Sequence, residues 1–251
     1  MVQQREAQST ASPRPLLPGG EVPTDAAVAL AAAVRAGLRG HADAGYVAGT
    51  VAARSPGKPV LGVRIPLLRG AVRTGLRAVT PRRGRADAVL VRQAATLLWH
   101  GETHEEELAA CMLLRLAEVA PTGQMLAGWA PLLDNWLSVD ELGGVLGAAI
   151  HTGVLMVGEV VWLAGSVSVW QRRLFLVALI TPIRFGLDPA GVPNLAAVLH
   201  DSAKPVRKAA AWLISATVKA RPDAAAQFRA LLPHGEPLPL VRLLGPGPAG
   251  R

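Results

Sequence analysis

The chain is a succession of helix-length segments, separated by short loops that contain proline or glycine. Each segment is about 10 to 18 residues long, the usual length of a helix in a globular protein. No run of alternating apolar and polar residues is long enough to indicate a strand. Ala, Leu, Val and Arg are abundant, whereas the chain has one Tyr and three Phe, a composition that favours helix over strand. The sequence therefore predicts an all-α fold.

Local signals mark where several of these helices begin. Thr24 suits an N-cap, Pro66 suits a first helical turn, and residues 103–106 have the pattern of a capping box. Because the segments follow one another through short turns without a repeat of fixed length, they predict a HEAT-like helical-repeat solenoid, folded as a single curved domain. The expected helices cover about residues 24–38, 46–54, a stretch from 66, 86–99, 103–120, 122–133, 135–150, 153–164, 168–186, 192–200, 203–220 and 222–232.

The two ends of the chain differ in composition from its middle. Residues 1–23 are polar and rich in proline, so we expect a disordered leader there. Residues 24–233 hold all of the expected helices, and a flexible tail with repeated Gly and Pro is expected over residues 234–251. Arg5 and Glu6 stand near the N-terminus without an apolar segment, so we expect no secretory signal.

Residues 143–170 are almost continuously apolar, so a membrane-spanning helix has to be weighed. The length would allow a span of about 20 residues. However, His151 and Glu159 lie inside the stretch, and a glutamate at the centre of a bilayer costs about 2.5 kcal/mol or more. The stretch also divides naturally into two helices near residues 151–153. We therefore expect the buried layer of a helical array and no membrane partner.

Charge and cysteine content bound the partner and the compartment. The net charge of +8 points to an acidic partner, either nucleic acid or an anionic membrane surface. Arg69, Arg73 and Arg77 recur at spacings of four and form a basic stripe on one helix face. Such a stripe is often only a solvated face, but the net charge and the basic loop over residues 80–85 favour phosphate contact. Cys111 is the only cysteine, which fits a reduced, cytoplasmic protein without disulfides.

Three stretches combine indole rings with charged side chains. In the first, Trp136 and Asp140 stand four residues apart and share one helix face. Residues 170–173 offer another indole with a cation one turn on, and residues 206–212 offer a third indole behind two cations. Taken singly, the aspartate would more often be a helix cap or a solvated charge, and each indole a core residue. Together they suit a cationic ligand attached to a polyanion, and alkylated DNA is such a ligand.

These three stretches resemble blocks of the AlkD-type DNA alkylation repair glycosylases, in the same order and at approximately the same spacing. Two upstream stretches resemble that family's early blocks, and together the match covers about residues 25–233. The five blocks are Leu61-Gly-Val-Arg64-Ile-Pro66-Leu-Leu-Arg69, His104-Glu-Glu-Glu-Leu108, Leu132-Leu-Asp-Asn-Trp136-Leu-Ser-Val-Asp140, Trp170-Gln-Arg-Arg173 and Leu199-His-Asp-Ser-Ala-Lys-Pro-Val-Arg-Lys-Ala-Ala-Ala-Trp212. The family folds as HEAT-like repeats around duplex DNA and excises cationic alkylpurines without base flipping, metal or cofactor.

The resemblance implies a monomeric, bacterial, nucleoid-associated DNA glycosylase that hydrolyses the N-glycosidic bond of N3-alkyladenine and N7-alkylguanine in duplex DNA, with bulky adducts left open. It makes Asp140 the carboxylate that stabilises the cationic deoxyribose and orients the attacking water. Trp136 and Trp212 would pack against the sugar and backbone of the lesion nucleotide. The remaining residues are assigned to DNA contacts: Arg173 near the lesion, Arg64 on a phosphate or groove, and Arg69, Arg73, Arg207 and Lys208 on phosphates.

Two other functions remain open at the level of sequence. Some relatives lack the catalytic residues and bind damaged or branched DNA without excision, and a HEAT-like array can also serve as a protein-binding scaffold. Pro205 and Ser215 depart from the family pattern, which leaves the presentation of the third indole open. His100 and His104 have a spacing that can hold zinc, but no third ligand is nearby, so no metal is expected. The other indoles are assigned to the core: Trp99, Trp129 and Trp162.

Overall fold

The computed structural model describes residues 17, 21–54, 56–80, 84–232 and 238–244, and every regular element within them is helical. The all-α prediction is therefore confirmed. The α-helices are α1 (Asp25–Gly40), α2 (Ala44–Arg54), α3 (Ile65–Val79), α4 (Ala88–Trp99), α5 (His104–Ala117), α6 (Gly123–Trp129), α7 (Trp136–His151), α8 (Val169–Arg184), α9 (Leu195–Leu199), α10 (Lys204–Ala220), α11 (Ala224–Leu231) and α12 (Leu238–Leu243). Short 3-10 helices lie between some of them: η1 (Ala130–Leu132), η2 (Val157–Glu159), η3 (Val161–Gly165) and η4 (Pro189–Gly191).

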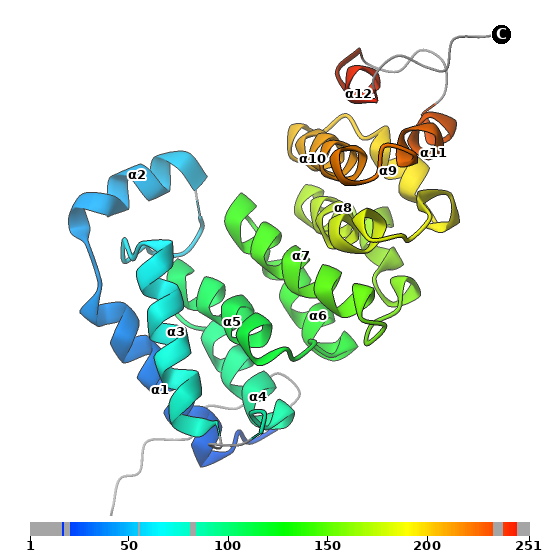
Figure 1. The fold of residues 1–251 in the computed structure, drawn as a ribbon. Helices are drawn as coiled ribbons and strands as arrows, with labels where there is room; N and C mark the ends of the chain where they lie inside the picture. Colours follow the sequence, from blue (N-terminus) through cyan, green and yellow to red (C-terminus); the bar gives the residue numbers. More distant parts are fainter. Residues whose placement is uncertain (1–16, 18–20, 55, 81–83, 233–237, 245–251) are drawn as a thin grey trace, which may run out of the picture.

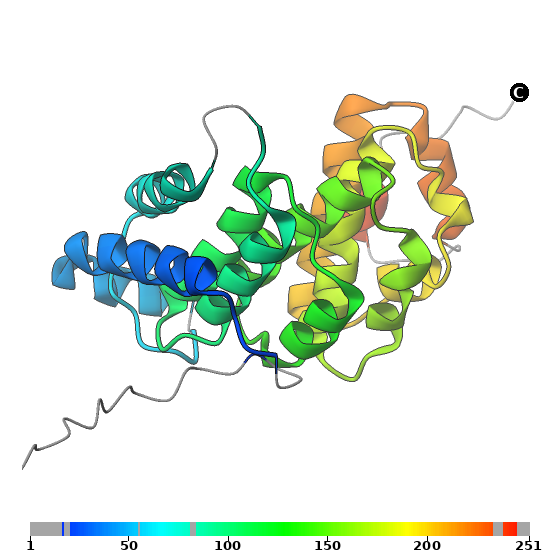
Figure 2. The same ribbon diagram turned by 90° about the horizontal axis from the view of Figure 1, so that it is seen from below.

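The helices pack largely in the order in which they follow one another along the chain. α1 packs on α3 and α4, α5 packs on α4 and α7, and α8 packs on both α7 and α10. Figure 1 shows the result as a curved row, with α1–α3 at one end and α10–α12 at the other, and the view from below in Figure 2 separates the same two ends. Sequential packing of this kind is typical of a helical-repeat solenoid, in which each unit buries its apolar face against its neighbours.

Capping signals in the sequence explain where several helices begin. Thr24 caps α1 with its side chain, and Pro66 stands in the first turn of α3, both as predicted. Glu106 reaches back to accept a hydrogen bond from the backbone N–H of Thr103, within the predicted capping box of α5. Asn135 caps α7 by accepting hydrogen bonds from two backbone N–H groups of its first turn. The hydrogen bonds of Thr24, Glu106 and Asn135 satisfy N–H groups that would otherwise lack an intrahelical partner, and Pro66 has no N–H group to satisfy.

The prediction of an α-helix over residues 153–164 is wrong. α7 ends at His151, Gly153 takes a left-handed conformation with φ at +73°, and the following residues form only η2 and η3. Glycine and β-branched valine recur in this stretch, and their low helix propensity outweighs the apolar pattern. The assignment of Trp162 to the core is also wrong. Its side chain is 43% exposed, and its indole Nε1 donates a hydrogen bond to the carbonyl oxygen of Glu159.

Other helices are shorter than the sequence pattern predicted. α5 ends at Ala117 rather than near residue 120, because Glu118 takes a left-handed conformation with φ at 56°. α9 occupies only the middle of the helix expected over residues 192–200. α12 lies within the segment predicted as a flexible tail, whereas residues 234–237 and 245–251 of that tail and most of the predicted leader lie outside the described residues. No helix in the described residues is long and apolar enough to span a membrane.

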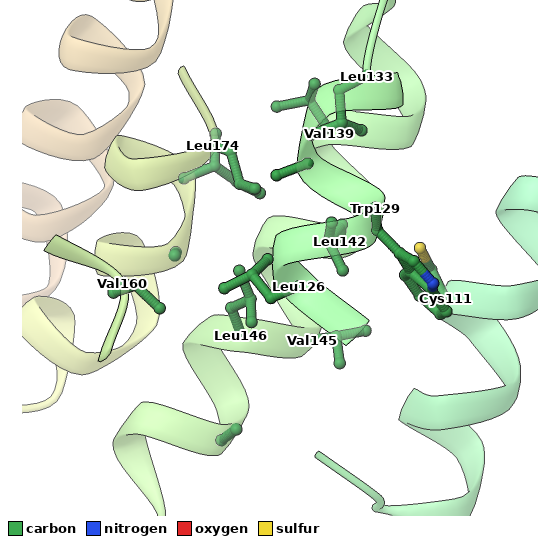
Figure 3. Close-up of a cluster of buried hydrophobic side chains, with 14 of the residues drawn as sticks. Cys111, Leu126, Trp129, Leu133, Val139, Leu142, Val145, Leu146, Val160 and Leu174 are labelled. Atoms are coloured by element: carbon green, nitrogen blue, oxygen red, sulfur yellow. The ribbon is translucent and has the colours of Figure 1, made fainter. Parts of the chain in front are cut away.

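The core runs through the middle of the row. Trp99 and Trp129 are buried as predicted, and their rings stack with centroids 4.4 Å apart and planes 3° apart. Figure 3 shows the cluster that includes Trp129, in which buried side chains of α5, α6, α7 and α8 gather, among them Cys111 and Leu142. Burial raises the pKa of the Cys111 thiol well above its ordinary value, so this cysteine is an inert part of the core.

Two glycines of α7 allow it to approach α8 closely. A Cβ atom on Gly143 would lie 2.5 Å from Cγ1 of Val177, and a Cβ atom on Gly147 would lie 2.9 Å from the carbonyl oxygen of Ala178. Side chains at these two positions would therefore force the helices apart. The glycines thus keep α7 and α8 close enough for side chains near the two helix starts to meet.

Candidate active site

The first turns of three neighbouring helices meet at one place in the row. Trp136 is the first residue of α7, Trp170 and Arg173 lie in the first two turns of α8, and Lys208 lies in the second turn of α10. Because α8 packs on both α7 and α10, these side chains come together although they are far apart in the sequence. The three indole-containing stretches singled out in the sequence thus lie side by side.

Asp140 and Arg173 form a two-pronged ion pair between α7 and α8. Nε of Arg173 donates to Oδ1 of Asp140 at 3.0 Å, and Nη2 donates to Oδ2 at 2.9 Å. Nη1 of the same guanidinium donates to the carbonyl oxygen of Pro205 at 2.8 Å. The planar donor fork of arginine matches a carboxylate in this way, so the pair has a fixed orientation. The guanidinium therefore ties the Asp140 carboxylate to both α8 and α10.

The two partners of this ion pair differ in their exposure to solvent. The side chain of Arg173 is 5% exposed, whereas that of Asp140 is 27% exposed. Burial raises the pKa of Asp140 above its ordinary value, and the neighbouring Arg173 opposes this effect. Burial likewise lowers the pKa of Arg173, and Asp140 opposes it. A ligand can therefore reach the carboxylate, while the cation that orients it is shielded.

Cations and a second indole surround the ring of Trp136. Cζ of Arg173 lies 4.3 Å from the ring centroid, and Nζ of Lys208 lies 5.0 Å from it. Trp170 meets Trp136 edge to face, with centroids 5.5 Å apart and ring planes at 81°. Cation–π contacts are worth about 0.5 to 2 kcal/mol each, depending on exposure. The ring of Trp136 therefore attracts positive charge one helical turn from a carboxylate, and in the structure Arg173 and Lys208 supply that charge.

Trp212 lies one turn beyond Lys208 on α10 and is 42% exposed. An aromatic ring left in solvent beside a charged site is a candidate contact surface for a ligand. Within the described residues, no ring contact joins Trp212 to Trp136. Ser215, one of the two departures from the family pattern, donates a hydrogen bond from Oγ to the carbonyl oxygen of Trp212 at 3.1 Å, so it stays within its own helix.

Two residues of the site were not predicted from the sequence. Trp170 was noted as an indole but given no role, and it packs against the ring of Trp136. The sequence grouped Trp170 with the other indoles through its position one turn before Arg173, but its ring contact with Trp136 depends on the packing of α8 on α7. Pro205 was noted only as a departure, and its carbonyl oxygen accepts a hydrogen bond from Arg173. A backbone oxygen is present at every residue, so no sequence signal could have found this contact.

The other predicted DNA-binding cations are exposed side chains of α3, of the residue just before it, and of α10. The side chain of Arg64, just before α3, is 63% exposed. Its Nη2 lies 3.6 Å from Oδ2 of Asp43, and its Cζ lies 5.2 Å from the ring centroid of Tyr46. α3 and α10 lie toward opposite ends of the row in Figure 1, so these cations are spread along it rather than gathered in one cluster. Those that are exposed and pair with no carboxylate among the described residues are Arg69, Arg73, Arg207 and Lys208.

No group of three or more His, Cys, Asp or Glu side chains within the described residues is placed to hold a metal ion. His104, one of the two histidines with zinc-like spacing, is buried, and His100 is exposed at the end of α4. What the site offers chemically is one accessible carboxylate, an indole face that attracts cations, and flanking positive side chains.

Comparison with known protein families gives one match over most of the chain. Residues 34–237 match the family model described as DNA alkylation repair enzyme. This range includes α3, α7, α8 and α10, and with them every residue of the candidate site. No curated protein sequence matches the chain.

Proposed function

Because the chain belongs to the DNA alkylation repair enzyme family over residues 34–237, we propose that it is a DNA glycosylase. Its substrates are cationic alkylated purines in duplex DNA, chiefly N7-alkylguanine and N3-alkyladenine, whose N-glycosidic bond it hydrolyses. The observation that carries this proposal is the accessible carboxylate of Asp140, held by Arg173 beside the cation-attracting ring of Trp136.

The chemistry of the substrate explains why so few groups suffice. An N7-alkylguanine carries a positive charge and leaves as a neutral base, so it needs no strong general acid. The bond between C1′ and the base nitrogen breaks, its electron pair goes to the base, and the deoxyribose becomes an oxocarbenium-like cation. The oxygen of a water molecule then bonds to C1′, and the proton that it loses passes to the surrounding solvent. The enzyme therefore has mainly to stabilise a transient positive charge and to orient water.

We assign these two tasks to Asp140. Its carboxylate places negative charge beside the developing cation and accepts a hydrogen bond from the attacking water. Arg173, predicted from the sequence to contact the DNA backbone, directs its guanidinium to Asp140 and Pro205 in the structure. We therefore propose that Arg173 acts by holding the carboxylate in place, since its shielded side chain is poorly exposed for a phosphate.

The indoles and Lys208 complete the proposed site. The ring of Trp136 faces the sugar of the lesion nucleotide, and the exposed ring of Trp212 packs against the neighbouring backbone. In the structure without DNA, the ammonium group of Lys208 lies over the ring of Trp136. There it would repel the positive charge that develops on the deoxyribose. Its side chain is long and exposed, so on the duplex it can turn to a phosphate and free the indole face for the sugar. The modified base stays in the duplex in this scheme.

The test of the proposed function is base release from duplex DNA. Excess protein is incubated with an oligonucleotide duplex that carries one 7-methylguanine, and free 7-methylguanine is measured by chromatography. We expect release from this duplex and none from the same duplex with guanine. Tight binding of the damaged duplex without release would instead favour the non-catalytic binder of damaged or branched DNA.

Removing the unpaired cations should flatten the salt dependence of DNA binding. The logarithm of the association constant falls with the logarithm of salt concentration by about 0.9 per neutralised phosphate. The double variants Arg69→Gln/Arg73→Gln and Arg207→Gln/Lys208→Gln should therefore each reduce the slope by up to about 1.8. Fluorescence anisotropy with a labelled duplex gives the association constant at each of several salt concentrations, and from these values the slope.

The matched control for this experiment is Arg39→Gln/Lys219→Gln, which removes two exposed cations at the C-terminal ends of α1 and α10. We expect its slope to equal that of the wild type. If all three double variants keep the wild-type slope, the basic side chains of α3 and α10 are not the DNA-binding surface.

A further inference from the structure

The first turn of α5 carries three consecutive glutamates that all point inward. Glu105, Glu106 and Glu107 are 2%, 5% and 4% exposed. A buried carboxylate is costly unless it is paired and hydrogen-bonded, so each of the three needs partners. Successive residues of a helix point about 100° apart, so the three side chains reach different neighbours. The proposed reaction uses none of them.

Two of these glutamates serve the N-terminal end of the row. Glu105 accepts hydrogen bonds from three consecutive backbone N–H groups, those of residues 61–63, at 2.9, 2.8 and 3.2 Å. Glu106 closes the first turn of its own helix and pairs with Arg35 of α1. Both therefore hold α1, α5 and the segment before α3 together.

Glu107 points the other way, to the start of α7. Its Oε1 lies 2.9 Å from Nζ of Lys58, and its Oε2 accepts a hydrogen bond from Oγ of Ser138 at 2.9 Å. Burial raises the pKa of Glu107, but His104, Lys58 and Ser138 beside the carboxylate lower it by more, so that its pKa lies below the ordinary value. The side chain is therefore an anion at neutral pH, with its charge balanced by Lys58.

A hydrogen-bond network continues from Ser138 to the cap of α7. Nδ2 of Asn135 donates to Oγ of Ser138 at 3.1 Å, and Oδ1 of Asn135 accepts from the N–H groups of Leu137 and Ser138, both at 3.0 Å. Asn135 is 0% exposed and Ser138 is 1% exposed, so water does not compete for these bonds. Trp136 lies inside this network, between the cap and the first bonded N–H group.

A second connection ties the same cap to the turn that carries Lys58. Nδ2 of Asn135 also donates to Oδ1 of Asp134 at 2.8 Å, and Oδ2 of Asp134 accepts from the N–H of Gly57 at 2.8 Å. The N-terminal end of α7 is thus fixed on its α5 side by this network, and on its α8 side, one turn further on, by the ion pair of Asp140 with Arg173. Trp136 and Asp140 lie between the two.

We propose that Glu107 is a positioning residue for the reaction: through Ser138 and Asn135, its carboxylate fixes the first turn of α7 and thereby the placement of Trp136 and Asp140. This inference rests on the proposed glycosylase function. Glu107 touches neither of the two site residues, so its effect is on their position alone. Small displacements of catalytic groups cost about tenfold to a hundredfold in rate.

The test compares Glu107→Gln and Ser138→Ala with Glu106→Gln. The control makes the same change at the preceding residue, which is buried to nearly the same degree but pairs with Arg35 of α1. With excess protein and a 7-methylguanine duplex, both test variants should release base about tenfold more slowly at saturation, with DNA affinity within about twofold of the wild type. Glu106→Gln should keep the wild-type rate, even where it lowers the melting temperature as much as the test variants do.

A double variant shows whether the two side chains act through one contact. Glu107→Gln/Ser138→Ala should be no slower than the slower single variant, because both changes act on the same contact between Ser138 and the side chain at position 107. Ser138→Ala is a small change to a good helix former, so it remains informative if Glu107→Gln does not fold.

The outcomes separate this inference from the proposed function. A wild-type protein that releases no base overturns the proposed function, and the positioning role falls with it. Release by the wild type together with wild-type rates in both test variants overturns only the positioning role. The same holds if Glu106→Gln slows release as much as Glu107→Gln does, because loss of stability would then explain both.

Discussion

Replacing Asp140 by asparagine is expected to slow base release at least tenfold, equivalent to about 1.4 kcal/mol of activation free energy. Asparagine keeps the size of the side chain and one oxygen for Arg173, but it removes the negative charge that stabilises the deoxyribosyl cation. The rate is measured in single-turnover excision of 7-methylguanine with protein in excess. DNA affinity and the helical circular dichroism spectrum should stay close to those of the wild type.

The matched control is Glu141→Gln, at the next position of α7. Glu141 pairs with Arg115 of α5 rather than with the site, so this variant loses the same charge from the same helix. It should excise at the wild-type rate. An Asp140→Asn protein that also keeps the wild-type rate would remove this carboxylate from the mechanism.

The pH profile of excision gives an independent check on the same carboxylate. Burial raises the pKa of Asp140, and only the ionised form can stabilise a cation. The enzymatic rate should therefore be level at neutral pH and fall as the pH is lowered through this raised pKa, at a higher pH than for an ordinary aspartate. This acid limb should be missing from the Asp140→Asn variant, once spontaneous depurination without protein is subtracted.

Cationic lesions should be excised and neutral lesions should persist, with a difference in rate of at least about a hundredfold, or about 2.7 kcal/mol. The positive charge of 7-methylguanine or N3-methyladenine makes the base a good leaving group before the protein acts. Asp140 and Trp136 stabilise the cation left on the sugar, but no group of the proposed site protonates a neutral base. Uracil and 1,N6-ethenoadenine, placed in otherwise identical duplexes, are the neutral test lesions.

Varying the size of the N7-alkyl group tests whether the protein recognises the shape of the modified base. If the modified base stays in the duplex, an N7-alkylguanine with a larger alkyl group should be released at a rate similar to that of 7-methylguanine. Base release is again followed under single-turnover conditions, so that binding and product dissociation do not limit the rate. Comparable excision of the neutral lesions would contradict the charge-driven mechanism and require a pocket that reads the base itself.

The sequence was sufficient for the fold class and for one half of the candidate site. Spacing of four placed Trp136 and Asp140 on one helix face, and α7 has both in its first two turns. Local capping signals also located the starts of α1 and α5. Such signals can be found in a sequence because they act over only a few residues. Arg173 was assigned to a DNA contact near the lesion. Its pairing with Asp140 was not predicted, because the two residues lie 33 positions apart and meet only when α8 packs on α7.

The errors have a physical pattern as well. Residues 153–164 are apolar enough for a buried helix, but their glycines and valines form 3-10 turns that leave Trp162 at the surface. The sequence identified the three glutamates of α5 only as part of a block that resembles the family. It gave no reason to expect that their side chains are buried. Their partners, such as Lys58 and Ser138, come from separate parts of the chain. Long-range polar networks of this kind are not visible in periodicity or composition.

The parallel stack of Trp99 and Trp129 gives the protein an optical property of its own. Two indoles with centroids 4.4 Å apart in a rigid, water-free environment couple their electronic transitions, so the near-ultraviolet circular dichroism should contain a paired band that reports the integrity of the core. Trp136, Trp170 and the exposed Trp212 stand apart from this stack, and their emission should be quenched when nucleobases come close, whereas the exposed Trp162, outside the site, adds a constant background. One spectrometer can therefore follow the fold through one set of tryptophans and site occupancy through the other, without an attached dye.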